Sequence, residues 1–251
     1  MNKKIIGIIP ARYASTRFPG KPLVDIRGKS MIQRVYEQAK KSSTLAEVIV
    51  ATDDHRIQEA VSAFGGKACM TSENHPSGTD RCAEVVDALN LHCDAIINIQ
   101  GDEPFIDPKQ IDLVCSCFDD DRTELATLIK KISSSEVLFS PNSPKVIVDS
   151  EAFAIYFSRH PIPYLRGSEE KNWLNRHLFY QHIGIYGYRK DVLKKITQLA
   201  PSSLEKAESL EQLRWIENGY RIKTAVTTLE TMAVDTPEDL TRILHSLNLT
   251  P

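Results

Sequence analysis

The feature that most constrains the fold is a set of short apolar runs in the first part of the chain. Residues 5–9 are apolar, rich in β-branched side chains and followed by Pro10, and residues 48–51 and 95–99 have the same character. A strand that is apolar on both faces has to be covered on both faces, which is typical of a parallel sheet. These runs therefore predict the strands of a central, mostly parallel sheet.

Helical patterns separate the three predicted strands. Residues 31–39 place apolar side chains on one helical face after Ser30, and residues 55–64 end at a Gly-Gly pair that suits a left-handed C-terminal turn. A third helical pattern covers residues 79–91. Strands that alternate with helices of this length predict an α/β fold with right-handed crossovers and helices flanking the sheet.

The pattern changes after residue 124. Strand-like runs with Pro- and Ser-rich connections cover residues 125–132, 145–148, 152–157 and 182–188. They predict a smaller insertion in which antiparallel pairing predominates. We therefore divide the chain into an α/β part over residues 1–128, an insertion over residues 129–190 and a C-terminal return to the α/β domain over residues 191–251.

The C-terminal return contains two further helical patterns and one strand. A capping box at Ser202 and Glu205 predicts one helix that runs to residue 218. Residues 221–227 predict a strand. Pro237 opens the last helix, because proline is well placed in the first helical turn.

Charge and composition narrow the function classes. The 251 residues contain 31 Lys and Arg against 33 Asp and Glu, a formal net charge of -2, so neither nucleic acid nor an anionic membrane is expected as a partner. No signal-peptide core precedes Pro10 and no apolar run approaches the roughly 20 residues of a membrane span, so we expect a soluble, cytoplasmic protein. The 5 cysteines are odd in number and lack zinc-site spacing, so we expect no metal or redox role for them.

A cationic loop follows the first predicted strand. Arg12, Arg17 and Lys21 lie within residues 10–23, among small side chains that let backbone N–H groups approach a ligand. A polyphosphate suits this cluster, because several cations can neutralise several oxygens. A solvated surface loop with three ordinary cations explains the same charges equally well. The loop lacks both GxxxxGK[ST] and GxGxxG, which argues against a Walker-type ATPase and an NAD site.

Two aspartates follow apolar runs at positions that can meet this loop. Asp102 comes after residues 95–99, and Asp235 comes after residues 232–234. Ligands of an open parallel sheet bind at the carboxyl ends of its strands, where carboxylates can hold Mg²⁺ against phosphates. Either aspartate alone could instead cap a helix. The two together favour metal-assisted phosphoryl or nucleotidyl transfer.

The cationic loop and seven further segments resemble motifs of the sugar nucleotidyltransferase family, in the family's order and along almost the whole chain. The loop carries IPAR at residues 9–12 and KPL at residues 21–23. The other segments are ATD at 51–53, SGTDR at 77–81, QGDEP at 100–104, YFSR at 156–159, HIGIYGY at 182–188, LEQLR at 210–214 and VDTPEDL at 234–240. In this combination they resemble the 3-deoxy-D-manno-octulosonate (Kdo) cytidylyltransferases, or CMP-Kdo synthetases. Residues 165–175 match no motif of that family.

The resemblance implies a Rossmann-like nucleotidyltransferase fold and a reaction. That reaction transfers the cytidylyl group of CTP to Kdo and gives CMP-Kdo and pyrophosphate, for bacterial lipopolysaccharide biosynthesis. The resemblance also implies that residues 129–190 serve the sugar side of the site and the contact of a homodimer.

Matched motif by motif, the resemblance assigns roles to individual residues. Arg12 and Lys21 would act in catalysis and hold the triphosphate, with Arg17 nearby, and Asp102 and Asp235 would be catalytic ligands of Mg²⁺. The remaining nucleotide-binding residues would be Ala11, Ser77, Gly78 and Arg81. The sugar-binding residues would be Gln100, Arg159, His182, Tyr186, Glu211 and Gln212.

Several of these roles have a structural alternative. His182 could be a satisfied core histidine, Glu211 an exposed helix carboxylate paired with Arg214, and Arg159 a surface residue. The ring of Tyr186 could serve in packing only. For the function itself, the alternatives are a cytidylyltransferase for an 8-amino-Kdo or sialic acid substrate, and a regulatory protein that binds the nucleotide without turnover. The paired aspartates argue against the regulatory protein.

Overall fold

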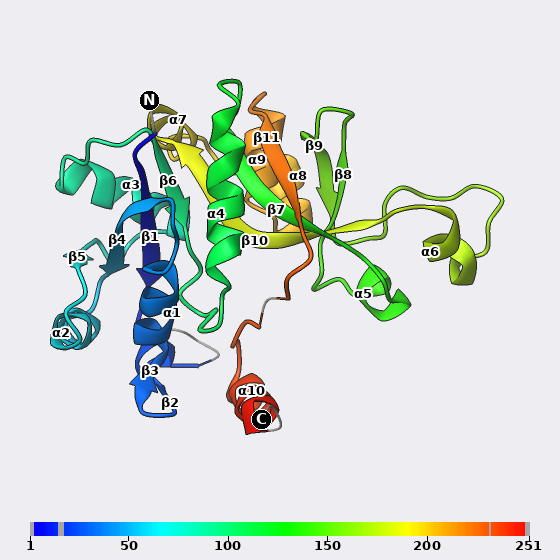
Figure 1. The fold of residues 1–251 in the computed structure, drawn as a ribbon. Coiled ribbons are helices and arrows are strands. Elements are labelled where there is room, and N and C mark those ends of the chain that lie inside the picture. Colours follow the sequence, from blue (N-terminus) through cyan, green and yellow to red (C-terminus); the bar gives the residue numbers. More distant parts are fainter. Residues whose placement is uncertain (1–2, 15–17, 231, 249–251) are drawn as a thin grey trace. The chain divides into compact units, whose positions relative to one another are not determined.

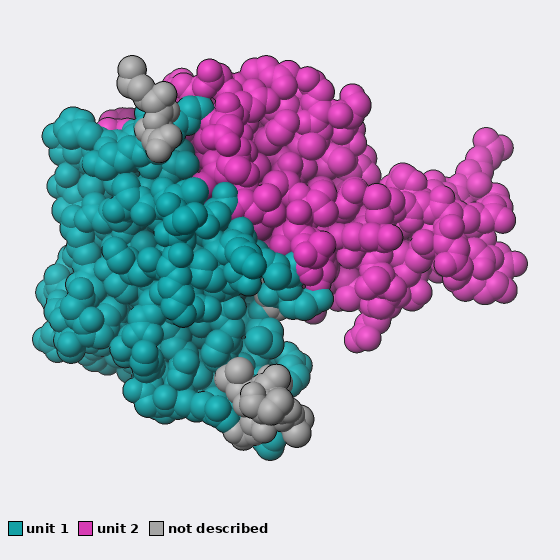
Figure 2. Space-filling view, viewed as in Figure 1, with its two compact units in different colours: residues 1–112, 229–251 teal, residues 113–228 magenta. Residues whose placement is uncertain are grey.

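The computed structural model describes residues 3–14, 18–230 and 232–248 of the chain (Figure 1). The chain forms two compact units, one of residues 1–112 with 229–251 and one of residues 113–228 (Figure 2). The sequence predicts boundaries after residues 128 and 190, whereas the structure has them after residues 112 and 228. Strand pairing explains the difference, because the strands over residues 125–131 and 222–227 pair with each other and so belong to one unit.

The first unit is an α/β unit. Its strands are β1 (Ile5–Ala11), β2 (Asp25–Ile26), β3 (Lys29–Ser30), β4 (Leu45–Thr52), β5 (Ala68–Met70) and β6 (Ala95–Asn98). Its helices are the 3-10 turn η1 (Lys21–Leu23), α1 (Met31–Ala39), α2 (His55–Ala63), α3 (Gly78–Ala88) and α10 (Pro237–Asn248), and α4 (Pro108–Ser116) crosses its boundary. The strands and helices predicted from the apolar runs of this part are confirmed. The three-residue β5 was not predicted, because only Cys69 of its side chains is buried.

The strands of the first unit form a parallel sheet in the order β6-β1-β4-β5. The central strand β1 has no exposed surface at Ile6, Ile8 and Ile9, as the uninterrupted apolar run predicts. Helix α1 packs against β1 and β4, α2 against β4 and β5, and α3 against β1 and β6. The parallel pairing brings the carboxyl ends of β1 and β6 to the same edge of the sheet.

The C-terminal segment returns to this first unit through a small hydrophobic cluster. The buried side chains of Val234 and Ile243 pack with those of Ile26 and Met31. Full burial of this kind stabilises by about 1.5–3 kcal/mol per large apolar side chain. The cluster therefore anchors the chain on both sides of Asp235, one residue after Val234.

The second unit is mostly antiparallel. Its strands are β7 (Leu125–Lys131), β8 (Lys145–Val148), β9 (Ala154–Ser158), β10 (Tyr180–Arg189) and β11 (Ile222–Thr227). Its helices are η2 (Cys117–Asp119), α5 (Ser135–Phe139), η3 (Glu170–Asn172), α6 (Trp173–Arg176), α7 (Lys190–Ile196), α8 (Ser203–Glu208) and α9 (Gln212–Glu217). The pairs β10–β7, β10–β8 and β8–β9 are antiparallel, and β11–β7 is parallel. The predicted predominance of antiparallel pairing is confirmed.

The prediction of a single helix from Ser202 to residue 218 is wrong in one respect, because the structure has two helices there, α8 and α9. The predicted capping box is present, with Ser202 accepting from the Glu205 N–H and the Glu205 carboxylate accepting from the Ser202 N–H. Ser209 then adopts a left-handed conformation, with φ of 51°, which ends α8. A helical side-chain pattern carries no signal for one such residue, and the periodicity continues across it.

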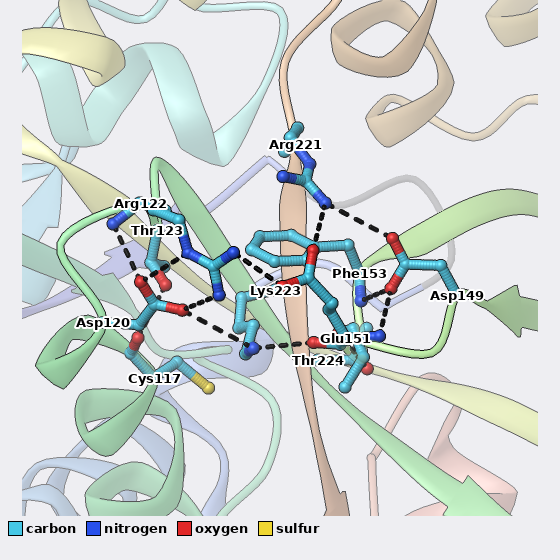
Figure 3. A network of polar contacts seen from close by, with 11 residues as sticks. Cys117, Asp120, Arg122, Thr123, Asp149, Glu151, Phe153, Arg221, Lys223 and Thr224 are labelled. Atoms are coloured by element: carbon cyan, nitrogen blue, oxygen red, sulfur yellow. Dashed lines mark hydrogen bonds and ion pairs between the residues drawn. The ribbon is translucent and has the colours of Figure 1, made fainter.

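A network of ion pairs surrounds the buried ring of Phe153 in the second unit (Figure 3). Arg221 lies 3.8 Å and Lys223 4.6 Å from the ring centroid. Arg122 binds Glu151 at 2.7 Å and Arg221 lies 3.3 Å from Asp149, so carboxylates offset the cations. The network ties the edge strand β11 to the connection between β8 and β9. Among the described residues, no helix has the length and apolar character needed to cross a bilayer.

Candidate active site

A cavity of about 300 Å³ opens in the first unit at the carboxyl ends of β1 and β6. This volume lies at the lower end of the roughly 300–1,000 Å³ typical of ligand pockets. It is lined by nine of the residues predicted for the site, namely Ala11, Arg12, Lys21, Ser77, Gly78, Arg81, Gln100, Asp102 and Asp235. Arg17 lies outside the described residues. The structure thus brings together the cationic loop, the start of α3 and both aspartates, which lie far apart in the sequence.

Two glycines allow the backbone segments to approach each other at the cavity. A Cβ atom added to Gly101 would lie 2.6 Å from the carbonyl oxygen of Pro10, and one added to Gly78 would lie 3.3 Å from the Pro10 ring. Real side chains do not tolerate the first distance, so residue 101 has to be glycine for the loop after β6 to lie against the end of β1. This close approach places Asp102 beside the cationic loop.

Asp235 reaches the same place through backbone hydrogen bonds. The Val234 N–H donates to the Asp102 carbonyl at 2.9 Å, which joins the C-terminal segment to the loop after β6. The Asp239 carboxylate accepts the N–H groups of Asp235 and Thr236 at 3.1 and 3.0 Å. Partial burial works against the charge of Asp239, but these hydrogen bonds outweigh it and lower the pKa of the carboxyl. An ionised Asp239 at the start of α10 fixes the backbone of Asp235.

Lys21 lies between the two aspartates. Its Nζ donates to Asp102 Oδ2 at 2.7 Å and to the Val234 carbonyl at 2.9 Å, and it lies 3.6 Å from Asp235 Oδ1. The exposed fraction of the Lys21 side chain is 15%, against 28% for Asp102 and 45% for Asp235. The ammonium group therefore interacts with both carboxylates at the edge of the cavity. The motif resemblance implies that this lysine holds phosphate, and the geometry adds an internal ion pair.

The aspartate pair fits a divalent metal ion. Both carboxylates already contact one shared cation, so their oxygens converge on a single position. No group of three or more His, Cys, Asp or Glu suited to a metal is found in the part of the chain that the structure describes. Mg²⁺ is commonly bound by one or two carboxylates, with substrate phosphates and water completing its shell. Asp102 and Asp235 would hold it in that way.

Arg81, near the start of α3, lines the cavity. Its guanidinium donates to Asp53 at 2.8 Å and to Thr71 at 2.5 Å, and the residue is 4% exposed. The buried ion pair ties α3 to the segment after β4, and the hydrogen bond to Thr71 ties it to the segment after β5. Ser77 caps α3 by accepting the Asp80 N–H, so the amino end of the helix, with its partial positive charge, opens on the cavity.

Sequence reasoning missed His75, which also lines the cavity. Its Nε2 makes a short hydrogen bond to Glu84, which also accepts the Ser72 N–H at 2.8 Å. Burial opposes the charge of Glu84, but the hydrogen bonds from Ser72 and His75 outweigh it and lower the pKa of the carboxyl. The available signal was local, since His75 stands two residues before the SGTDR motif and Glu84 three residues after it.

The predicted sugar-side residues other than Gln100 belong to the second unit. The rings of His182 and Tyr186 lie 5.2 Å apart, and Tyr186 meets Trp215 edge to face at 5.2 Å. Burial lowers the pKa of His182 to about 3, so the ring is neutral at pH 7 and binds Thr127 through Nε2 at 2.9 Å. Burial, and then the charge of Glu211, raises the pKa of Tyr186 well above its usual value. Neutral polar groups of this kind suit the hydroxyls of a sugar.

Arg159 and Gln212 differ in how their polar atoms are engaged. The Arg159 guanidinium donates to the carbonyls of Glu208, Pro141 and Ser209 at 2.6, 2.8 and 3.1 Å, and so stabilises the end of α8. Its binding of a substrate carboxylate stays a prediction. Gln212 is 3% exposed, and its Nε2 donor has no hydrogen-bond partner among the described residues. Buried amide donors are normally paired, so this one is available to a ligand.

Comparisons with known proteins identify the family of this chain. A family model described as cytidylyltransferase matches residues 6–223. A 3-deoxy-manno-octulosonate cytidylyltransferase of Cytophaga hutchinsonii is 59% identical over 246 residues, which are 98% of this chain and 98% of that protein. One of Parabacteroides distasonis is 58% identical over 248 residues, covering 97% of this chain and 98% of that protein.

A solved structure agrees over nearly the full length as well. The structure of CMP:2-keto-3-deoxy-manno-octonic acid synthetase complexed with CTP matches with a TM-score of 0.90 and 46% identity, and covers 98% of both chains. The resemblance found in the motifs is therefore confirmed. The chain belongs to the cytidylyltransferase family and, within it, to the 3-deoxy-manno-octulosonate cytidylyltransferases.

Proposed function

We propose that this protein transfers the cytidylyl group of CTP to Kdo, giving CMP-Kdo and pyrophosphate. The observation that carries the proposal is the contact of the Lys21 ammonium with both Asp102 and Asp235 in a cavity that Arg12 also lines. A polyphosphate needs cations at one end and metal-binding carboxylates at the reacting phosphorus, and this cavity offers both. The near-full-length relatives named for this reaction support the same substrates.

The reaction joins the anomeric hydroxyl oxygen of the sugar to the α-phosphorus of CTP. The bond from that phosphorus to the oxygen bridging the β-phosphate breaks, pyrophosphate leaves, and the hydroxyl proton passes to water. Arg12 and Lys21 stabilise the negative charge that develops on the departing pyrophosphate, and cations fixed for this purpose are an effective way to lower a barrier. Asp102 and Asp235 would hold Mg²⁺, which would neutralise phosphate charge and make the attacking hydroxyl more acidic.

The remaining predicted residues bind the nucleoside and the sugar acid. The backbone at Ser77 and Gly78 and the fixed Arg81 serve the cytidine side. Gln100, Arg159, His182, Tyr186, Glu211 and Gln212 serve the sugar. The Gln212 Nε2, which has no hydrogen-bond partner among the described residues, and the neutral ring of His182 support this assignment. We further propose that the protein acts as a cytoplasmic homodimer, with residues 129–190 at the dimer contact, and that its product enters lipopolysaccharide biosynthesis.

A substrate screen tests the proposed reaction. Each of CTP, UTP, ATP and GTP is combined with Kdo, 8-amino-Kdo or N-acetylneuraminate in the presence of Mg²⁺, and pyrophosphate release is measured. Release from CTP with Kdo, and much less from the other pairs, is the expected result. Preference for 8-amino-Kdo or N-acetylneuraminate would instead establish the alternative acid sugar. Tight CTP binding without pyrophosphate release from any pair would contradict the proposed enzymatic activity.

A further inference from the structure

Lys21 occupies a position that a metal ion would need. Its ammonium group has three oxygens around it, from Asp102 at 2.7 Å, the Val234 carbonyl at 2.9 Å and Asp235 at 3.6 Å. Asp102 Oδ2 and Asp235 Oδ1 both face the position that the Lys21 ammonium occupies. An internal cation therefore partly offsets the charge of the aspartate pair in this structure.

We propose that the Lys21 ammonium and a divalent cation exclude each other at Asp102 and Asp235, so that the metal enters together with a nucleotide. The inference rests on the proposed function, because it takes these aspartates as the metal ligands. The new element is that Lys21 binds first the two carboxylates and then the nucleotide phosphates. In the free protein its single positive charge offsets one of the two carboxylate charges, and in the loaded protein it binds the phosphates.

Charge and geometry support the exclusion. Two cations held a few ångströms apart repel strongly, most of all where solvent screens them poorly, and the Lys21 side chain is largely buried. A metal ion alone brings no anion to which the displaced ammonium could turn. A metal–nucleotide complex brings phosphate oxygens, which suit a lysine head as a compact point charge. The flexible four-carbon stem lets that head move while the backbone of η1 stays in place.

The exclusion predicts strong coupling between the two ligands. Nucleotide should raise the affinity of the protein for the metal, and the metal should raise the affinity for nucleotide by the same factor, since coupling free energies are reciprocal. Without Lys21, the aspartates would be open to the metal alone, and the coupling should decrease. Arg12 lines the same cavity and provides a matched control, because its loss removes one positive charge without removing the ammonium between the aspartates.

The test is a titration of the full-length protein with Mn²⁺, with free Mn²⁺ measured by electron paramagnetic resonance. Wild type, Lys21→Met, Arg12→Met and the double variant Lys21→Met/Asp102→Asn are titrated without nucleotide, and wild type and Asp102→Asn are titrated also with CTP. Thermal melting verifies that each variant is folded, and Lys21→Gln replaces Lys21→Met if the latter fails to fold. We expect Lys21→Met to bind Mn²⁺ alone roughly 10-fold more tightly than wild type, within the range of typical coupling factors.

The remaining arms separate the possible outcomes. The inference is supported if the double variant loses the increase in Mn²⁺ affinity that Lys21→Met shows. Arg12→Met should show a smaller increase in Mn²⁺ affinity than Lys21→Met. Equal Mn²⁺ affinity of wild type and Lys21→Met, or an equal gain in Arg12→Met, overturns the inference while the proposed metal site stands. Unchanged Mn²⁺ binding by Asp102→Asn in the presence of CTP overturns the metal site itself, and the inference with it.

Discussion

The backbone N–H of Val234 donates to the carbonyl oxygen of Asp102 at 2.9 Å, and this bond joins two segments of the first unit that are remote in sequence. Val234 is fully buried in the cluster with Ile26 and Met31, so the bond is held in place by apolar packing. One residue further on, Asp235 comes within 3.6 Å of the same lysine that binds Asp102. The hydrogen bond thus sets the spacing of the proposed metal ligands.

Removal of either carboxylate should abolish turnover while the protein stays folded. We expect Asp102→Asn and Asp235→Asn to lower kcat by roughly 100-fold or more, because an amide binds Mg²⁺ weakly and cannot neutralise it. Pyrophosphate release measures the loss, and thermal melting verifies the fold. The control is Asp25→Asn, an exposed residue of the same unit outside the cavity. Near-normal rates of either site variant at low Mg²⁺ would contradict the assignment.

The buried pair of Arg81 and Asp53 should contribute to stability as a unit. Its side chains are 5% and 13% exposed, so the loss of one partner leaves a charge in a poorly solvated place. We expect Arg81→Met and Asp53→Asn each to lower the free energy of unfolding by about 3–5 kcal/mol. The double variant should lose clearly less than the sum, as measured by urea unfolding in a double-mutant cycle. Strict additivity would show that the two groups do not interact.

Gly101 should not tolerate even a methyl group. In Gly101→Ala the new Cβ would lie 2.6 Å from the Pro10 carbonyl oxygen, so the backbone that carries Asp102 has to move. We expect a loss of about 1–3 kcal/mol in stability and a larger relative loss in kcat. Gly184→Ala is the control, because a Cβ there meets nothing within 4 Å and should change stability by about 0.5 kcal/mol or less. Equal effects of the two substitutions would refute the close-approach argument.

His182 should make the protein sensitive to acid. Burial lowers its pKa in the folded protein to about 3, from an ordinary value of 6.5. Below pH 6.5 the unfolded chain therefore binds a proton at this residue that the folded chain does not bind. The free energy of unfolding falls as the pH falls from about 6.5 toward 3. His182→Gln, which keeps a hydrogen-bonding group for Thr127, should reduce the loss between pH 6.5 and 4.5 by about 2 kcal/mol in urea unfolding. The exposed His160→Gln is the control, and an unchanged slope in His182→Gln would count against the neutral ring.

The ring of Phe153 should stabilise the network of the second unit (Figure 3). In Phe153→Leu the apolar volume is partly kept, but Arg221 and Lys223 lose the aromatic face that they contact at 3.8 and 4.6 Å. We expect a loss of about 1–2 kcal/mol, measured by thermal or urea unfolding. The exposed Ile155→Leu on the neighbouring strand is the control. A loss no larger than in the control would mean that the cations do not depend on the ring.

The sequence by itself determined the elements whose pattern is local. The apolar run of β1 required burial on both faces, and the capping residues Ser30 and Ser202 marked helix starts that the structure confirms. The motifs indicated the family, and most of the predicted nucleotide-side residues line one cavity. Each of these inferences depends on neighbours in the chain, which periodicity and motif spacing record directly.

Only the tertiary structure decided which charges meet. Lys21 faces Asp102 and Asp235 because a glycine close approach, a backbone hydrogen bond and the burial of Val234 act together. The same holds for the hydrogen bond between His75 and Glu84, because their closeness to the SGTDR motif marks the two residues but not their pairing. Contacts of this kind depend on distances between residues that are separated along the chain, and no local pattern encodes those distances.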